Sequence, residues 1–361
     1  MTSNYIQPAE YPFVSVVIPV RNEATNIVRS ISAVLRQTYP ASYYEIIVAD
    51  GMSTDSTVDL IERLPDANRI KIIANEQRIQ ASGMNRGIEI AQGEIIVRVD
   101  GHTVINNDYI RYCVEMLLTT NADNVGGSIY PVAHTALGRA IAAASKSPFA
   151  IPSTFRVGTK MQYVDTVYMG AWWREVFERI GKFDEGFVIN EDYELNHRIR
   201  AAGGKILYLP DLYSEYYGQE TLPGLAHQHF RYGCSKPRTI DKHPTSVRLR
   251  HLAAPALTAS IIIGGVFAVL FPAAVFLWIA CIAVYLLCVI VFTFHSARKH
   301  GYHILLKLPS VFLTLHLAWG CGFWYGVIHI LTMRLHKATL KSILTISPAL
   351  AKMMSEFAPF V

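Results

Sequence analysis

Short apolar runs alternate with amphipathic segments through the first hundred residues of the chain. The apolar, β-branched runs predict four strands, at residues 13–20, 45–49, 70–74 and 94–99. Apolar residues at helical spacing predict the helices between them, at residues 23–37, 54–64 and 80–91. Strands that alternate with helices in this way predict a mostly parallel, Rossmann-like sheet with helices on both faces, which is an α/β fold.

The pattern becomes irregular beyond residue 124, where short strands and loops are expected. Three further helices are predicted, at residues 174–180, 192–202 and 221–234. A strand is predicted at residues 206–209, and Pro210 is expected to end it because proline cannot donate a hydrogen bond to a sheet.

Long segments without charged side chains dominate the C-terminal part. Residues 252–297 and 308–333 contain no Asp, Glu, Lys or Arg. Because roughly 20 apolar residues suffice to cross a bilayer, three transmembrane helices are predicted, at residues 252–271, 273–294 and 308–332. The predicted organisation is a globular domain, a transmembrane module and a tail, at residues 1–250, 251–335 and 336–361.

The third apolar segment leaves the membrane topology open. Basic residues before the first segment and after the second would lie on one side, as the positive-inside rule requires. A complete third span would place Arg334 on the other side, against that rule. The segment is also less uniformly apolar, because it contains Gly320, Gly322 and Gly326. We predict a third span from its length, and a re-entrant or interfacial segment is the alternative.

Charge and cysteine content agree with this organisation. Charged residues make up 17% of the chain and the net charge is +5. The excess basic residues flank the apolar segments, where they would face anionic lipid head groups rather than nucleic acid. The five cysteines form no CxxC pair, which indicates a reducing compartment. Residues 1–10 contain no apolar core of a signal peptide, so the globular domain is expected in the cytoplasm.

Polar clusters follow three of the predicted strands, at residues 21–23, 50–51 and 100–102. Ligands of parallel sheets bind beyond the carboxyl ends of the strands, so the three clusters are expected to line one crevice. Asp50 can there point at a base or ribose edge. Asp100 and His102 offer a carboxylate and an imidazole, which suit Mn²⁺ or Mg²⁺ when diphosphate oxygens and water complete the shell. The alternative for both Asp-Gly pairs is an ordinary turn.

Two later motifs carry candidate chemistry. Glu191 and Asp192 open a predicted helix, where acidic residues also occur simply because they complement the helix dipole. The functional interpretation makes Asp192 the base that takes a proton from an acceptor hydroxyl. Gln228, Arg231 and Tyr232 share one helical face, which can bind a diphosphate or a sugar. An amphipathic helix on a membrane surface is the alternative.

In order and spacing, the motifs over roughly residues 13 to 235 resemble family 2 inverting glycosyltransferases of the GT-A fold. The run from Ser15 to Glu23 looks like the opening strand of that family, and Asp50-Gly51 to Asp55 looks like its nucleoside-contacting segment. Gly83, Asn85 and Gly87 match the Gly-rich segment of the family, and Asp100-Gly101-His102 lies where the family has Asp-x-Asp. Further along the chain, Glu191-Asp192 matches its catalytic Glu-Asp, and Gln228-x-x-Arg231-Tyr232 matches its Gln-x-x-Arg-Trp.

The resemblance implies a role for each matched position. The implied donor-binding residues are Pro19, Arg21, Glu23, Asp50, Arg78, Gly83 and Asp100. Asp100 and His102 are the implied ligands of Mn²⁺ or Mg²⁺, and Asp192 with Glu191 the implied catalytic pair. Diphosphate or acceptor binding falls to Gln228, Arg231 and Tyr232. The chain departs from the family at His102, which replaces Asp, and at Tyr232, which replaces Trp.

The long apolar C-terminal part and the Asp-Gly-His motif are similar to bacterial succinoglycan-type exopolysaccharide glycosyltransferases. That similarity implies transfer of one sugar from a nucleotide-sugar, such as a UDP-hexose, to a polyprenyl-diphosphate-linked saccharide. The expected location is the cell inner membrane, as a multi-pass protein with its catalytic domain in the cytoplasm. A polyprenyl-phosphate sugar synthase is one alternative, and a non-catalytic assembly subunit with a vestigial transferase domain is another.

Overall fold

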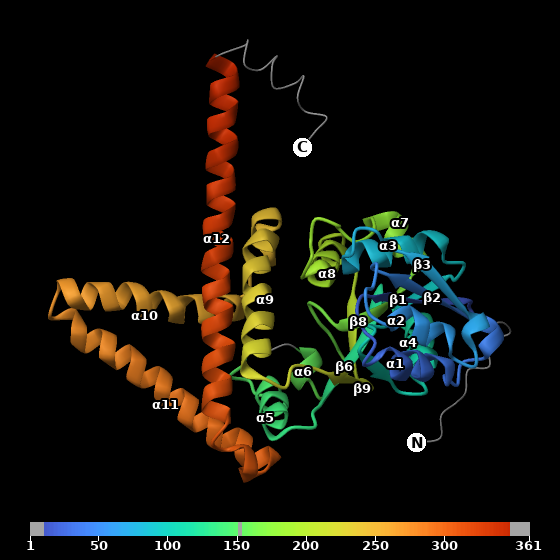
Figure 1. The fold of residues 1–361 in the computed structure, drawn as a ribbon, viewed down its shortest axis with the longest axis horizontal. Coiled ribbons are helices and arrows are strands. Elements are labelled where there is room, and N and C mark those ends of the chain that lie inside the picture. The colour runs from blue at the N-terminus through green and yellow to red at the C-terminus, as the bar shows by residue number, and fades with distance from the viewer. Residues whose placement is uncertain (1–10, 151–153, 347–361) are drawn as a thin grey trace. The chain divides into compact units, whose positions relative to one another are not determined.

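The computed structural model describes residues 11–150 and 154–346. The chain divides into two compact units (Figure 1). The first comprises residues up to 225 together with residues 279–315, and the second comprises residues 226–278 together with the chain from residue 316. The domain boundary expected at residue 250 stays a prediction.

The first half of the sheet in the first unit is parallel. It contains β1 (Val14–Val20), β2 (Tyr44–Asp50), β3 (Ile70–Ala74) and β4 (Ile95–Arg98), in the order β3-β2-β1-β4. All three pairings within this group are parallel. The parallel arrangement predicted for the first hundred residues is therefore confirmed, and the carboxyl ends of these strands lie along one edge of the sheet.

The second half of the sheet is mixed. β8 (Tyr168–Trp173) pairs antiparallel with β4, and the order continues through β6 (Asn124–Val132), β9 (Ile206–Tyr217) and β5 (Thr103–Ile105). The short strand β7 (Gln162–Tyr163) pairs with β9. The prediction that Pro210 ends its strand was wrong. β9 continues to Tyr217, because its register against β6 shifts beside Pro210, and such an irregularity tolerates a residue without an N–H.

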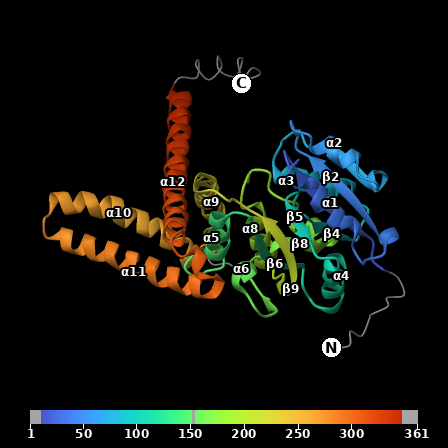
Figure 2. The same ribbon diagram turned by 60° about the horizontal axis from the view of Figure 1, so that its bottom comes forward.

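Helices cover both faces of the sheet (Figure 2). On one face α1 (Ile27–Leu35), α2 (Thr57–Glu62) and α4 (Tyr109–Thr119) bury apolar side chains in one core with Val16 of β1. On the other face α3 (Gln80–Ile90), α7 (Arg174–Ile180) and α8 (Glu191–Ala201) pack in a second core with Val17. Because successive residues of a strand point to opposite faces, Val16 and Val17 belong to different cores. The predicted helices are confirmed, although α1 begins four residues later than expected.

A third apolar core in the first unit joins segments that are distant in the sequence. It contains α5 (Ala136–Ser145), which lies where loops and short strands were expected, the end of α11 (Ala274–His300) and the beginning of α12 (Leu308–Ile346). The Phe149 ring stacks on Phe292 of α11, with the ring centroids 4.7 Å apart. Further short helices are α6 (Thr154–Val157), η1 (Ala41–Tyr43), η2 (Ala67–Arg69), η3 (Pro244–Ser246), η4 (Leu249–His251) and η5 (Tyr302–Ile304).

The second unit is built from α9 (Leu222–Lys242), α10 (Ala253–Leu270) and the larger part of α12. The helix predicted at 221–234 continues to Lys242. A Cβ added to Gly322 of α12 would lie 2.1 Å from the carbonyl oxygen of Phe230 on α9, and one added to Gly326 would lie 2.4 Å from that of Cys234. The glycines therefore allow the two helix backbones to touch, as small residues do in membrane helix pairs.

Three helical segments of the described chain are long and apolar enough to cross a membrane. They are Leu249–Leu270, Ala274–His300 and Leu308–His336, with mean hydropathies of 2.1, 3.0 and 1.4. Large apolar side chains on the first two are strongly exposed, for example Val269 at 84% and Phe276 at 81%. Exposed apolar surface on this scale is typical of contact with lipid or with a partner protein.

Candidate active site

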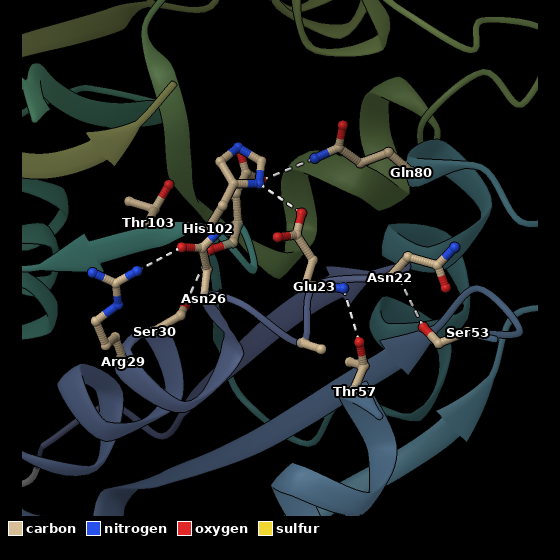
Figure 3. Close-up of polar contacts among 12 residues, drawn as sticks. Asn22, Glu23, Asn26, Arg29, Ser30, Ser53, Thr57, Gln80, His102 and Thr103 are labelled. Atoms are coloured by element: carbon tan, nitrogen blue, oxygen red, sulfur yellow. Dashed lines mark hydrogen bonds and ion pairs between the residues drawn. The ribbon is translucent and has the colours of Figure 1, made fainter. Parts of the chain in front are cut away.

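The segments that follow β1 and β2 are joined by hydrogen bonds (Figure 3). The backbone N–H of Asn22 donates to the Ser53 hydroxyl at 2.9 Å, and the Asn22 side-chain oxygen accepts from the backbone N–H of Thr54 at 2.8 Å. The backbone N–H of Gly51 donates to the carbonyl of Val20 at 2.7 Å. Two of the three predicted polar clusters therefore lie side by side, as expected.

Asp50 is the last residue of β2 and lies beside these two segments. Its carboxylate accepts from the backbone N–H of Ser53, at 3.1 and 3.3 Å for the two oxygens, so it also stabilises the turn after β2. Its carbonyl accepts from Asn75 at 2.7 Å, and the Asn75 carbonyl accepts in turn from the backbone N–H of Arg78 at 3.0 Å. Both readings of Asp50, as a turn residue and as a group facing a ligand, are compatible with this geometry.

Pro19 and Gly83 meet where α3 approaches the sheet. A Cβ added to Gly83 would lie 3.1 Å from the Cβ of Pro19 and 3.0 Å from the side-chain nitrogen of Asn75. A Cβ on Gly51 would lie 3.2 Å from the Cβ of Arg21. The sequence-predicted donor residues Pro19, Arg21, Asp50, Arg78 and Gly83 are thus linked by direct contacts or by one shared neighbour.

A buried ion-pair network joins the end of β4 to the start of α8. Arg98 donates through Nε to Asp100 Oδ1 at 2.8 Å and through Nη1 to Glu191 Oε1 at 3.2 Å. The side chains of all three residues are only 5% exposed. Gln80 of α3 also donates to Asp100 Oδ1, at 2.9 Å. The guanidinium therefore connects the Asp-Gly-His motif with the Glu-Asp motif, although 93 positions separate Arg98 from Glu191.

The surroundings shift the pKa values of both carboxyl groups. Burial alone would raise the pKa of Asp100, but the charges of Arg98 and His102 outweigh it and hold that pKa below its usual range. At Glu191, burial and the neighbouring Asp192 raise the pKa, and Arg98 opposes them only in part. Asp100 is therefore ionised at neutral pH, whereas Glu191 holds a proton more readily than an ordinary glutamate does.

Asp192 differs from its neighbour Glu191 in exposure. Glu191 is 4% exposed, whereas Asp192 is half-buried at the first turn of α8. The Asp192 carboxylate accepts from the backbone N–H of Tyr193 at 2.6 Å. The preceding residue, Asn190, has a left-handed backbone with φ of 68°, which turns the chain sharply into the helix. Of the Glu-Asp pair, Asp192 is therefore the more exposed residue.

The Gly-rich segment on α3 has a structural role in addition. Asn85 donates to the carbonyl of Phe183 and accepts from its backbone N–H, both at 2.9 Å, so it fixes the loop that precedes α8. A Cβ on Gly87 would lie 2.3 Å from a methyl group of Val17, so only glycine lets α3 pack this closely on β1.

His102 lies beside Glu23 in Figure 3. Its Nδ1 is 2.8 Å from Glu23 Oε1, and its ring makes an edge-to-face contact with Tyr216 at 5.4 Å between centroids. Burial lowers the pKa of His102, but the hydrogen bond to Glu23 and the charge of Asp100 more than compensate and leave it above its ordinary value. The third polar cluster therefore joins the first one, and the expected convergence of the three strand ends is confirmed.

The donor atoms of Asp100 and His102 fit a divalent cation in part. Among residues 11–150 and 154–346, no group of three or more His, Cys, Asp or Glu side chains could hold a metal ion by itself. Asp100 and His102 supply one carboxylate and one imidazole, and both ligand types occur in Mn²⁺ sites. A cation bound by these two residues would need further oxygen ligands, which a diphosphate and water provide.

The Gln-x-x-Arg-Tyr motif lies on α9 in the second unit. Gln228 donates through Nε2 to the hydroxyl oxygen of Tyr232 at 3.1 Å, as expected for residues four apart on one helical face. Arg231 is exposed. The structure thus brings the members of this motif together on their own helix.

Sequence reasoning missed Arg98 and did not foresee the contact between Glu23 and His102. An arginine near the end of a strand that is otherwise buried is the one signal for Arg98 in the sequence, because an unpaired buried charge is very costly. The contact between Glu23 and His102 leaves no such signal, since 79 positions separate the two residues.

Comparisons with known proteins give the family. Residues 15–182 match the model of Glycosyl transferase family 2. The chain is 30% identical over 323 residues to the succinoglycan biosynthesis protein ExoA of Rhizobium meliloti, a match that covers 86% of this chain and 93% of that protein. It is also 26% identical over 326 residues to the dolichyl N-acetyl-α-D-glucosaminyl phosphate 3-β-D-2,3-diacetamido-2,3-dideoxy-β-D-glucuronosyltransferase of Methanococcus voltae, covering 88% of this chain and 97% of that protein.

A solved structure supports the fold. The mannosyltransferase PcManGT of Pyrobaculum calidifontis, solved in complex with GDP-Man and Mn²⁺, superposes with a TM-score of 0.58 at 18% sequence identity, covering 83% of this chain and 88% of that one. The expected GT-A-like sheet is thereby confirmed, with the mixed second half described above. The enzyme class expected from the motifs is confirmed by the relatives, and the chain belongs to glycosyl transferase family 2.

Proposed function

We propose that this protein transfers one sugar from a nucleotide-sugar to a hydroxyl of a lipid-linked saccharide, with inversion at the anomeric carbon. One observation carries the proposal. Arg98 bonds both Asp100 and Glu191, so it holds an ionised Asp100 beside the Glu-Asp motif, in which Asp192 is the more exposed carboxylate. An inverting transfer needs these two groups, since one carboxylate must neutralise a cation on the leaving diphosphate and the other must accept a proton.

The strand-end crevice supplies the donor site in this proposal. Pro19, Arg21, Asp50, Arg78 and Gly83 are the proposed donor-binding residues, beyond β1 and β2, where open α/β sheets bind nucleotides. Asp100 and His102 would hold Mn²⁺ or Mg²⁺ against the diphosphate. When bound, that cation stabilises the charge that develops on the leaving group. The PcManGT complex contains both a nucleotide-sugar and Mn²⁺, which supports this division.

Asp192 is the proposed base. It accepts the proton of the attacking hydroxyl while the hydroxyl oxygen bonds to the anomeric carbon, and the bond from that carbon to the diphosphate breaks, with its electron pair leaving on the diphosphate oxygen. Glu191 is less suited because it is buried and its pKa is raised by that burial. Gln228, Arg231 and Tyr232 are proposed to steady the diphosphate or the acceptor, because arginine pairs with phosphate and an aromatic ring stacks on a sugar.

The apolar helices suggest the acceptor. The printed names of two relatives refer to succinoglycan biosynthesis and to a dolichyl-phosphate-linked sugar. We propose that helices α10, α11 and α12 hold this enzyme in the inner membrane with its catalytic domain in the cytoplasm. Membrane lipids then surround the helices, and tethering raises the effective concentration of a polyprenyl-diphosphate-linked saccharide at the site.

A reconstituted transfer assay tests the proposal. Purified full-length protein in lipid vesicles is supplied with labelled UDP- and GDP-hexoses, and either with a polyprenyl-diphosphate-linked monosaccharide or with polyprenyl phosphate. We expect label in the lipid only with the saccharide acceptor, loss of transfer in EDTA, and recovery with Mn²⁺ or Mg²⁺. Label on polyprenyl phosphate would identify a polyprenyl-phosphate sugar synthase instead. Absence of transfer with every pair would contradict the proposed donors and acceptor.

A further inference from the structure

The side chain of Glu23 is directed at His102 (Figure 3). We propose that Glu23 is a positioning residue that orients His102 as a cation ligand, and that this pair makes the site favour Mn²⁺ over Mg²⁺. The inference rests on the function proposed above. It changes the assignment of Glu23, which the family resemblance placed among the donor-binding residues.

The first step concerns the ring nitrogens of His102. A carboxylate accepts hydrogen bonds, so the 2.8 Å contact with Glu23 Oε1 places an N–H on Nδ1. The lone pair available for a cation is then on Nε2, for which the structure gives no hydrogen bond within the described chain. Metal-bound histidines usually donate their other N–H to a carboxylate, which fixes both tautomer and ring direction.

The second step concerns the position of Glu23 itself. Its backbone N–H donates to the Thr57 hydroxyl at 2.8 Å, and its carbonyl accepts from the backbone N–H groups of Asn26 and Ile27, both at 2.8 Å. The backbone of Glu23 is thus held between α2 and the first turn of α1. Because that backbone is fixed, the side chain reaches His102 from a rigid base and can hold the ring in one direction.

The third step concerns the turn that carries His102. The carbonyl of Asp100 accepts from the Ser30 hydroxyl at 3.1 Å and from the backbone N–H of Thr103 at 3.0 Å. A Cβ on Gly101 would lie 3.1 Å from the Cγ of Glu23 and 2.9 Å from a methyl group of Val20. The middle glycine of Asp-Gly-His therefore permits the close approach of Glu23, so the motif and Glu23 form one unit. The ring of His102 also makes an edge-to-face contact with Tyr216.

The last step concerns the choice of cation. Asp100 is the one carboxylate assigned to the cation, and its Oδ1 already accepts from Arg98 and from Gln80. The second ligand is an imidazole instead of the second carboxylate of Asp-x-Asp. Mg²⁺ depends on hard oxygen ligands and negative charge, whereas Mn²⁺ accepts imidazole more readily. Replacing a carboxylate by an imidazole that is held in place therefore disfavours Mg²⁺ more than Mn²⁺.

Electron paramagnetic resonance of bound Mn²⁺ tests the inference without a transfer assay. Full-length protein is titrated with MnCl₂ in the presence of UDP or, separately, GDP, and electron spin echo modulation reports nitrogen ligands. We expect nitrogen modulation in the wild type and its loss in His102→Ala. Glu23→Ala is expected to weaken Mn²⁺ binding about 10- to 100-fold, the usual cost of losing an orienting partner. Glu23→Gln keeps an oxygen acceptor for the Nδ1–H, so its Mn²⁺ affinity should lie between those of the wild type and Glu23→Ala.

Two further variants make the test specific. His102→Asp restores two carboxylates, so it should bind Mn²⁺ without nitrogen modulation and should let Mg²⁺ displace Mn²⁺ at lower concentration than in the wild type. Glu62→Ala removes an exposed glutamate from α2 and should leave Mn²⁺ binding unchanged. Absence of nitrogen modulation in the wild type with both nucleotides, or unchanged Mn²⁺ affinity in Glu23→Ala and Glu23→Gln, overturns the inference. Sugar transfer without nitrogen modulation would remove this inference alone, and modulation without transfer would remove the proposed function alone.

Discussion

The crevice beyond the strand ends and the C-terminal helices depart from the usual distribution of side chains in opposite directions. In the crevice, charged groups are buried, with Arg98, Asp100 and Glu191 each 5% exposed. Along the helices, apolar groups are exposed, as at Val269 and Phe276. Globular proteins mostly do the reverse on both counts.

The two departures are stabilised in different ways. Each buried charge in the crevice has an opposite charge within 3.2 Å in the same chain, so the compensation is internal. The exposed apolar side chains of α10 and α11, such as Val269 and Phe276, have little protein around them within the described residues, so their compensation is not found in that part of the chain. The comparison indicates that the strand-end region holds charged groups in fixed positions, and that the helices present apolar side chains to apolar surroundings. The predictions below test each half.

The largest effect is expected from the catalytic carboxylate. Asp192→Asn keeps the size of the side chain but cannot accept the proton. Because a lost general base typically costs about 100- to 10,000-fold, transfer to a hydroxyl acceptor should fall by that factor while nucleotide binding persists. The measurement is single-turnover transfer of labelled sugar in vesicles. Asp211→Asn, at an exposed position on β9, is the matched control and should transfer normally. Near-normal transfer by Asp192→Asn would remove the base from the mechanism.

The next largest effect is expected from removing the buried charge of Arg98. Arg98→Met leaves Asp100 and Glu191 buried without a counter-charge, and breaking a buried ion pair costs about 3–5 kcal/mol of unfolding free energy. Chemical unfolding in detergent, followed by near-ultraviolet circular dichroism, measures the loss.

The control for this prediction is Arg179→Met. Arg179 pairs with Asp123 but is 54% exposed, so its removal should cost no more than about 1 kcal/mol. Equal losses of unfolding free energy in the two variants would show that burial does not make the ion pairs of Arg98 more important for stability.

The apolar helices are tested by placing a charge on them. Leu287 lies in the middle of α11 and is 59% exposed. If α11 crosses a bilayer, Leu287→Asp should cost about 2.5–3.5 kcal/mol of insertion free energy. A membrane-insertion assay with a glycosylation reporter measures that cost. Leu118→Asp, at a similarly exposed position on α4, should change the stability of the globular part by only about 0.5 kcal/mol. A small effect at both positions would argue for a partner protein in place of lipid around α11.

The smallest effect is expected at a carboxylate near the surface. Hydrogen bonds from the backbone N–H groups of His134 and Thr135 lower the pKa of Glu220. A lowered folded-state pKa stabilises the fold above the unfolded pKa of about 4.3, and that contribution is lost as the pH falls through the folded-state value. The melting temperature should therefore fall slightly more in the wild type than in Glu220→Gln when the pH is lowered from 6 into the acidic range. A steeper decline in the variant would contradict the assigned pKa shift.

The sequence predicted the half of the fold whose signals are local. The bounds of β3 and α7 agree with the predicted ones, because each segment carries its own apolar pattern and its own end signals. The strand expected to end at Pro210 continues as β9, because pairing with β6 on both sides of an irregularity outweighs one missing donor. Pairing between strands that are distant in the sequence cannot be recognised from the residues of one short segment.

The candidate site shows the same limit. The three strand-end clusters were expected to converge because parallel strands share an edge, and they do. The contacts that give them their chemistry, between Arg98 and Glu191 and between Glu23 and His102, join positions 93 and 79 apart. The glycines at 322 and 326 were interpreted as weakening an apolar span, whereas in the structure they are the places where α12 touches α9.

That glycine contact has a mechanical consequence. At Gly322 and Gly326 no side chain separates the backbones of α9 and α12, so sliding one helix along the other would bring larger side chains against backbone at these two positions. The tilt of a transmembrane helix follows the thickness of the surrounding hydrocarbon layer. If α12 crosses the membrane, a thinner or thicker bilayer reorients α9 and, with it, Arg231. Membrane thickness would then set the tilt of both helices together, because the glycine contacts join them.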